Sequence, residues 1–142
     1  MLEPVSWLYN ADITVCNPVT GSNQGLGKAL LDAVLASGER VVATTRKPEA
    51  LSELSKQYAP SQLLVVPLDV TNEVQIKSAF KATKEHFRRL DVVVNNAGYG
   101  IQGEIEATPE VEARRIMETL FWGAVHVTKE VGQRFLVRHI LN

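Results

Sequence analysis

The chain has 142 residues, 45% of them hydrophobic and 22% charged, which is the size and composition of one folded domain. Its 15 Lys and Arg and 16 Asp and Glu give a formal net charge of -1, which argues against nucleic acid or an anionic membrane as a partner. The single cysteine, Cys16, and the lack of a signal-peptide or membrane-spanning pattern favour a cytoplasmic location.

Short β-branched runs alternate with helical patterns along the chain. The expected strands are residues 13–15, 41–44, 63–66 and 92–94, and each is followed by a predicted helix. This alternation is typical of a parallel sheet with helices on both faces. We therefore expect a Rossmann-like, doubly wound α/β domain over residues 13–142, incomplete at about four to five strands. Residues 1–12 form an N-terminal extension of unassigned structure.

The first two predicted helices have recognisable ends. The first should cover residues 25–37, with Gly38 as its left-handed C-terminal cap, and Pro48 opens a short second helix. The apolar stripe expected on the first helix consists of Leu26, Ala29, Leu30, Ala33 and Val34.

The third and fourth predicted helices follow the third and fourth strands. Asn72 should cap the third helix, and its apolar face consists of Ile76, Ala79, Phe80, Thr83 and Phe87. The fourth helix should begin at Thr108-Pro109-Glu110, with the threonine hydroxyl as its cap, and pack Phe121 and Trp122 against the sheet.

A glycine-rich loop lies between the first predicted strand and the first predicted helix. It reads Thr20-Gly21-Ser22-Asn23-Gln24-Gly25-Leu26-Gly27. A dinucleotide pyrophosphate needs close backbone N–H groups, the positive end of a helix and no β-carbons in the way, and the three glycines supply that clearance. A glycine-rich turn without a ligand is the alternative, but the position between a strand and a helix favours phosphate binding.

The end of the second predicted strand bears on which dinucleotide would bind. An enzyme that uses NAD usually has an acidic residue about 20 residues after the loop, where it holds the ribose 2′-OH. This chain has Thr44-Thr45-Arg46-Lys47 there, two hydroxyls and two cations that could meet a 2′-phosphate. The sequence favours NADP over NAD, with a solvated basic pair as the alternative.

Two further motifs, Leu68-Asp69-Val70 and Asn95-Asn96-Ala97-Gly98, follow the third and fourth predicted strands. With the glycine loop they make the chain resemble the short-chain dehydrogenase/reductase family, from about Ile13 to at least Lys129. The resemblance implies that Asp69 lies beside the adenine and that residues 96–98 line the adenine ribose. Lys129 is expected near the nicotinamide half, with a surface lysine as the alternative. The expected cofactor-binding residues are Gly21, Ser22, Asn23, Gly25, Leu26, Gly27, Thr45, Arg46, Asp69, Asn96, Ala97, Gly98 and Lys129.

The resemblance also implies a set of catalytic residues that the sequence does not show. The family transfers a hydride between nicotinamide and a carbonyl or alcohol with a Ser, a Tyr followed four residues later by a Lys, and an Asn on the fourth helix. The sequence has no Tyr-x-x-x-Lys, and Leu120 falls at the Asn position. Pro18 also interrupts the expected central strand, where a proline removes a ladder hydrogen bond.

Residues 139–142 resemble the start of the family's fifth strand. These departures lead us to expect a truncated product or a decayed copy, with the catalytic residues beyond the C-terminus. The function predicted is the cofactor-binding half of an NADP-dependent oxidoreductase acting on a small carbonyl or alcohol. The alternative is an inactive nucleotide-binding remnant, or a fragment of a longer enzyme. An exposed sheet edge and fourth helix favour aggregation or pairing with another chain. The three histidines lack the spacing of a zinc site, so no metal is expected.

Overall fold

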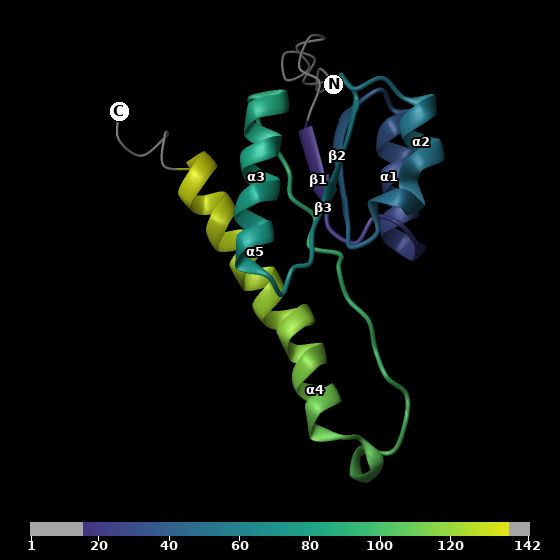
Figure 1. Ribbon diagram of the computed structural model, residues 1–142, viewed down its shortest axis with the longest axis vertical. Helices are drawn as coiled ribbons and strands as arrows, with labels where there is room; N and C mark the ends of the chain where they lie inside the picture. The colour runs from purple at the N-terminus through teal and green to yellow at the C-terminus, as the bar shows by residue number, and fades with distance from the viewer. Residues whose placement is uncertain (1–15, 137–142) are drawn as a thin grey trace, which may run out of the picture.

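The computed structural model describes residues 16–136. Three parallel strands, β1 (Cys16–Val19), β2 (Arg40–Thr45) and β3 (Leu63–Pro67), form a sheet in the order β1-β2-β3. Helices α1 (Gly25–Ala36) and α2 (Ser52–Gln57) lie on one face, while α3 (Glu73–Phe87) and α5 (Ala124–Val131) lie on the other (Figure 1). The fold is therefore the open, Rossmann-like α/β arrangement that the strand and helix alternation predicts.

Two of the four strand predictions are confirmed. β2 and β3 form where expected, whereas β1 begins at Cys16, so the prediction at residues 13–15 lies outside the described residues. The C-terminal residues 139–142, expected to begin a fifth strand, also lie outside them. The fourth expected strand, residues 92–94, runs beside β1 but pairs with it through one isolated parallel bridge, Val19 to Val94.

Pro18 explains why the segment at 92–94 does not form a regular ladder. Cys16, Pro18 and Thr20, the residue after β1, bond this segment: the carbonyl of Cys16 accepts from Val92 N–H, that of Pro18 accepts from Val94 N–H at 2.9 Å, and Thr20 N–H donates to Val94 O. In a parallel ladder the nitrogen of residue 18 would donate to the carbonyl of Val92, and a proline has no hydrogen to donate. The missing bond weakens the pairing by about 0.5–1.5 kcal/mol.

Asp91 compensates at the start of the same segment. Its Oδ2 accepts the backbone N–H of Cys16 at 2.8 Å, and its carboxylate also pairs with the Arg89 guanidinium at 2.6 Å. Burial opposes ionisation of Asp91, but the hydrogen bonds from Arg89 and Cys16 outweigh it, so the pKa of this carboxyl lies below its usual value. The carboxylate thus fastens β1 to the segment that follows α3.

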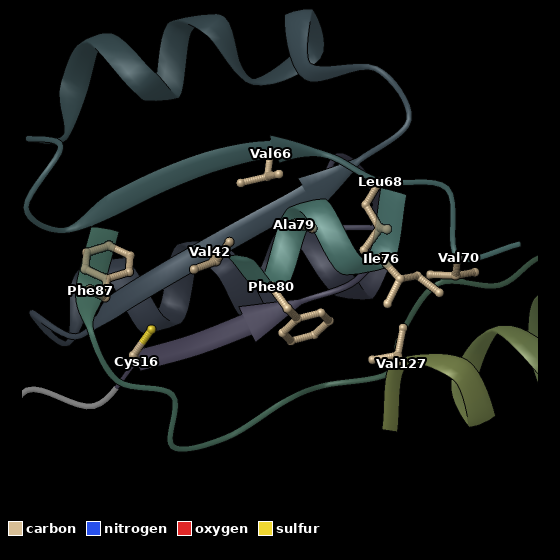
Figure 2. Close-up of a cluster of buried hydrophobic side chains, with 10 residues drawn as sticks. All are labelled: Cys16, Val42, Val66, Leu68, Val70, Ile76, Ala79, Phe80, Phe87 and Val127. Atoms are coloured by element: carbon tan, nitrogen blue, oxygen red, sulfur yellow. The ribbon is translucent and has the colours of Figure 1, made fainter. Parts of the chain in front are cut away.

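Cys16 itself lies in the core on the α3 and α5 side of the sheet. Figure 2 shows its side chain in one buried cluster with Val42 and Phe87, to which residues of β3, α3 and α5 contribute. Burial, followed by the nearby Asp91 charge, raises the pKa of the Cys16 thiol to about 12. The five residues predicted for the apolar face of α3, Ile76, Ala79, Phe80, Thr83 and Phe87, are all buried.

On the opposite face, α1 has the predicted length but a different buried stripe. The buried residues are Gly27, Leu31 and Leu35, with Leu30 and Val34 packed beside them, whereas Leu26 is 84% exposed. Of the five residues expected in the stripe, Leu30 and Val34 pack at its edge, whereas Leu26, Ala29 and Ala33 are exposed, so the buried stripe is displaced by about one position around the helix. The first turn fixes this rotation, because Gly27 packs against the chain at Gly21 and Asn96.

The remaining helical turns occupy the positions predicted for the second, third and fourth helices. A 3-10 turn, η2 (Pro48–Leu51), precedes α2, and Gly38 takes the predicted left-handed conformation after α1, with φ of +82°. Asn72 caps α3 as predicted, because its Oδ1 accepts from the N–H groups of Val74 and Gln75. The predicted Thr108 cap is wrong, since that hydroxyl donates back to Glu104 O while Pro109 stands at the cap position.

The C-terminal helix is long and continuous. After the 3-10 turn η3 (Ile105–Ala107), α4 (Glu110–Met117) continues through the π-helical η4 (Glu118–Gly123) into α5 and ends in a second π-helical stretch, η5 (Gly132–Leu136). Its α4 part projects beyond the sheet (Figure 1). Phe121 and Trp122 are about half exposed, so the prediction that they pack against the sheet is wrong. Association with another chain through this face stays a prediction.

Among residues 16–136, no helix combines the length and the apolar character needed to cross a membrane.

Candidate dinucleotide-binding site

The glycine loop has the backbone shape that a phosphate ligand needs. Gly21 and Gly25 have φ of +66° and +57°, a region that favours glycine. A Cβ placed on Gly25 would meet nothing within 4 Å, so open space lies in front of the start of α1. No side chain caps that helix, which leaves its first N–H groups available to a ligand.

Asn96, which follows the segment 92–94 beside β1, holds the glycine loop in place. Its side-chain Nδ2 donates to Thr20 O at 2.9 Å and to Gly21 O at 3.2 Å. A Cβ on Gly27 would lie 2.5 Å from the Gly21 carbonyl oxygen and would also collide with the Asn96 amide. Gly27 is therefore required for close packing between the helix and the loop.

Thr20 completes this clamp and was not predicted as a site residue. Its buried hydroxyl oxygen accepts the N–H groups of Asn96 and Ala97, each at 2.9 Å, and the hydroxyl donates to Val94 O at 3.2 Å. These bonds fix the turn at residues 96–98 against Thr20, two residues after Pro18. The signal in the sequence was present, because Thr20 opens the glycine motif at the end of a strand.

These elements enclose a hollow of about 340 Å³ beside the start of α1, within the size range of ligand pockets. Nine of the thirteen predicted residues line it: Gly21, Asn23, Gly25, Leu26, Arg46, Asp69, Asn96, Ala97 and Gly98. The lining residues that sequence reasoning missed are Gln24, Leu68, Val70, Tyr99 and Thr119. Four of these five are direct neighbours of predicted residues, whereas Thr119 comes from the distant η4, and no sequence pattern indicated it.

The other four predicted residues do not line this hollow. Gly27 is buried behind the loop, and the Ser22 hydroxyl is buried and donates to Thr44 O at 3.0 Å. Thr45 is buried as well, and its Oγ1 accepts the N–H of Lys47. Lys129 lies on α5 and lines a separate hollow between α3 and α5.

Arg46 and the two threonine hydroxyls at the end of β2 differ in their exposure. Arg46 is exposed and lines both the main hollow and a wider, open one of about 610 Å³ beside it. The Thr44 hydroxyl is buried and donates to Val19 O at 3.1 Å. The expectation that Thr44 and Thr45 are available to a 2′-phosphate is therefore wrong, because the Thr44 hydroxyl bonds the neighbouring strand β1 and the Thr45 hydroxyl oxygen bonds the turn after β2.

Leu120 lies where the resemblance would put a polar residue. Its Cδ2 occupies the space beside Gly98, 2.5 Å from where a Cβ on that glycine would be. A leucine side chain neither donates nor accepts a hydrogen bond. Within residues 16–136 this part of η4 therefore offers packing beside the hollow, and the nearest hydroxyl on the same turn belongs to Thr119.

The residues present fit a nicotinamide dinucleotide in three respects. The open space before Gly25 and the uncapped start of α1 suit a pyrophosphate. Asp69 can accept from a base, and Arg46 can meet a phosphate on the adenine ribose. The hollow thus matches the adenosine and pyrophosphate part of such a cofactor.

Comparison with known proteins agrees with a site for a nicotinamide dinucleotide. A family model described as short chain dehydrogenase matches residues 16–139. An uncharacterized oxidoreductase of Schizosaccharomyces pombe is 42% identical over 112 residues, which cover 79% of this chain and 37% of that protein. The 15-hydroxyprostaglandin dehydrogenase [NAD(+)] of Mus musculus is 32% identical over 118 residues, covering 80% of this chain and 44% of that enzyme.

A solved structure agrees with these matches. A short-chain dehydrogenase from Streptomyces avermitilis superposes with a TM-score of 0.83 at 32% identity, over 90% of this chain and 47% of that one. The chain therefore spans less than half the length of the relatives that it matches here. With its Rossmann-like sheet, its glycine loop and the clamp from Asn96, the chain belongs to the short-chain dehydrogenase family of oxidoreductases, whose fold binds a nicotinamide dinucleotide.

Proposed function

We propose that this chain binds NADP(H) and carries the cofactor-binding part of an oxidoreductase acting on a small carbonyl or alcohol, in the cytoplasm. The observation that carries the cofactor choice is the exposed Arg46 on the wall of the hollow, at the end of a strand that has no acidic residue there. A guanidinium can form paired hydrogen bonds with a phosphate, whereas a ribose 2′-OH is usually held by a carboxylate. The unpaired, buried Cys16 supports the location.

Each part of the site has a separate task in this proposal. When bound, the dinucleotide would supply hydride transfer at its nicotinamide ring. The glycine loop and the start of α1 hold its phosphates, Asn96 and Thr20 keep the loop and the 96–98 turn at a fixed separation, and Arg46 selects the phosphorylated ribose. The acid and base that would complete the reaction are not among the residues described.

The cofactor choice is tested by titrating the reduced dinucleotides NADPH and NADH into the protein and following nicotinamide fluorescence. We expect tighter binding of NADPH. Arg46→Ala should weaken NADPH binding about 10- to 100-fold, the range of a charge-assisted hydrogen bond, and leave NADH unchanged. Lys47→Ala is the matched control, since Lys47 does not line the hollow. Tighter binding of NADH would contradict the proposal.

A second candidate function is dinucleotide binding without catalysis. Leu120 favours it, because a leucine stands beside Gly98 where the family resemblance implies an asparagine. The two candidates differ in one assay, in which the protein is incubated with NADPH and a panel of ketones and aldehydes while cofactor absorbance is followed. Turnover would exclude the binding-only function, whereas saturable binding with no oxidation would favour it.

A further inference from the structure

The outer face of α3 carries a row of positive charge. Lys77, Lys81 and Lys84 recur at intervals of four and three residues, which places them on one side of the helix, and Arg88 follows at its C-terminal cap. All four side chains are exposed, and the buried face of α3 consists of other residues. These four residues are called the basic stripe below. At 1.5 Å per residue the stripe is about 16 Å long.

Most of the charge on the basic stripe is left without a partner. Lys81 Nζ lies 3.8 Å from Glu85 Oε1, and within the described part of the chain the other three cations form no ion pair. With four cations and one glutamate, residues 77–88 carry a net charge of +3. Cations stabilise the negative C-terminal end of a helix, but that effect is confined to the last turn, so it does not account for Lys77.

The opposite charge collects on residues 104–118, which lead into α4, form it and end at the start of η4. This acidic segment contains five glutamates and two arginines, a net charge of -3. The two arginines pair inside the helix, with Glu110 and Glu112. The acids of the segment that form no ion pair with any described residue are all exposed: Glu104, Glu106 and Glu118. The acidic segment thus matches the basic stripe in amount of charge and is opposite to it in sign.

The acidic segment and the basic stripe do not meet within one chain. α5 packs on α3, whereas α4 projects beyond the sheet and has its main contacts with η4, which continues it (Figure 1). No ion pair among residues 16–136 joins the two surfaces. Each surface also carries a largely exposed apolar side chain, Val74 one turn before Lys77 and Ile105 between two of the glutamates. Both surfaces are therefore open to a second molecule.

We propose that the acidic segment of one copy of this chain docks on the basic stripe of another copy. Opposite charges steer the two surfaces together and set which surface meets which, while Val74 and Ile105 add apolar contact. The contact joins two different surfaces, so it is distinct from a pairing of α4 with its own counterpart. Exposed ion pairs each contribute little, so the association is weak and depends on several of them and on the salt concentration.

Sedimentation velocity of the full chain over a concentration series tests the proposal. The unaltered protein should associate in about 20 mM salt and at least tenfold more weakly in about 500 mM salt, because the screening length falls from about 20 Å to about 4 Å. Charge reversal then addresses each surface, with Lys77→Glu and Lys84→Glu in one variant and Glu104→Lys and Glu106→Lys in another. Each variant alone should associate about ten- to thirtyfold more weakly. An equimolar mixture should regain the association, because each surface again finds one of opposite charge.

The matched control is Lys47→Glu with Lys56→Glu, which makes the same change in net charge on exposed residues outside both surfaces. It should associate as the unaltered protein does, and circular dichroism should show that every variant is folded. A control weakened as much as the stripe variant would reduce the effect to net charge and overturn the proposal. So would a mixture that fails to associate, or association that neither salt nor reversal changes, which would belong to an apolar face such as that of Phe121 and Trp122. An unaltered protein that stays monomeric in low salt would leave the stripe to a different acidic partner and overturn docking between copies.

Discussion

Gly27→Ala is the substitution for which the structure predicts the largest local consequence. The added Cβ would lie 2.5 Å from Gly21 O and collide with the Asn96 amide, and neither neighbour can yield freely. Gly21 O is backbone within the loop, and Asn96 is committed to two hydrogen bonds with that loop. The helix, the loop or the amide must therefore move.

The magnitude follows from these contacts. Overpacking costs about 1–3 kcal/mol, and each of the two Asn96 hydrogen bonds contributes about 1 kcal/mol, so a variant that loses both bonds should lose about 3–5 kcal/mol of unfolding free energy. That is a large part of the stability of a domain of this size, about 5–15 kcal/mol. The loop would also leave the position in which it can meet phosphates, so NADPH affinity should fall at least tenfold.

Urea denaturation and NADPH titration measure the two effects. Gly100→Ala is the matched control, because its Cβ would meet nothing within 4 Å and its backbone is not left-handed. We expect the control to match the unaltered protein in both assays. If Gly27→Ala denatured at the same urea concentration as Gly100→Ala and bound NADPH equally well, the close packing of α1 on the loop would contribute neither to stability nor to NADPH affinity.

Three further predictions concern β1 and its neighbour. Pro18→Val restores an N–H opposite Val92 O, so hydrogen exchange of the Val94 amide should slow by about two- to tenfold. The global free energy of unfolding should change little, because replacing proline raises the conformational entropy of the unfolded chain. Unchanged exchange at Val94 would show that the missing hydrogen bond does not weaken the pairing. The pKa of Asp91 lies below its usual 3.8, so its contribution to stability is present above that pH and lost as the pH falls through the folded-state value. Asp91→Asn should therefore lower the free energy of unfolding at neutral pH and reduce its fall at acid pH, as measured by denaturation across a pH series. An unchanged fall at acid pH would contradict this role of Asp91. Cys16, with its thiol pKa raised to about 12, should react with iodoacetamide only as fast as the protein opens, whereas rapid labelling of the native state would show that it is not buried.

The sequence predicted those features that depend on local pattern. Asn72 as a cap, Gly38 as a left-handed residue and the buried face of α3 follow from rules that act within a few residues. Most of the hollow was also predictable, because its residues lie at the ends of parallel strands, which meet at one edge of a sheet.

The errors arose where contacts between distant segments decide the outcome. The rotation of α1 depends on Gly27 packing against Asn96, and the periodicity of Leu26 and Ala29 could not reveal that contact. The Thr44 and Thr45 hydroxyls were assigned to a ligand, yet both satisfy backbone groups of neighbouring strands and turns. Thr119 reaches the hollow from a π-helical stretch whose position depends on the whole α3 and α5 layer.

The central claim is that the glycine loop, Asn96 and Asp69 form one dinucleotide site, and amide chemical-shift mapping with NADPH tests it most directly. Saturable shifts should appear at Gly21, Gly25, Asp69 and Gly98 with one common dissociation constant, while Gly38 and Gly132, which lie outside the hollow, stay unchanged. Shifts absent from the loop, or present instead around Lys129 in the hollow between α3 and α5, would contradict the account.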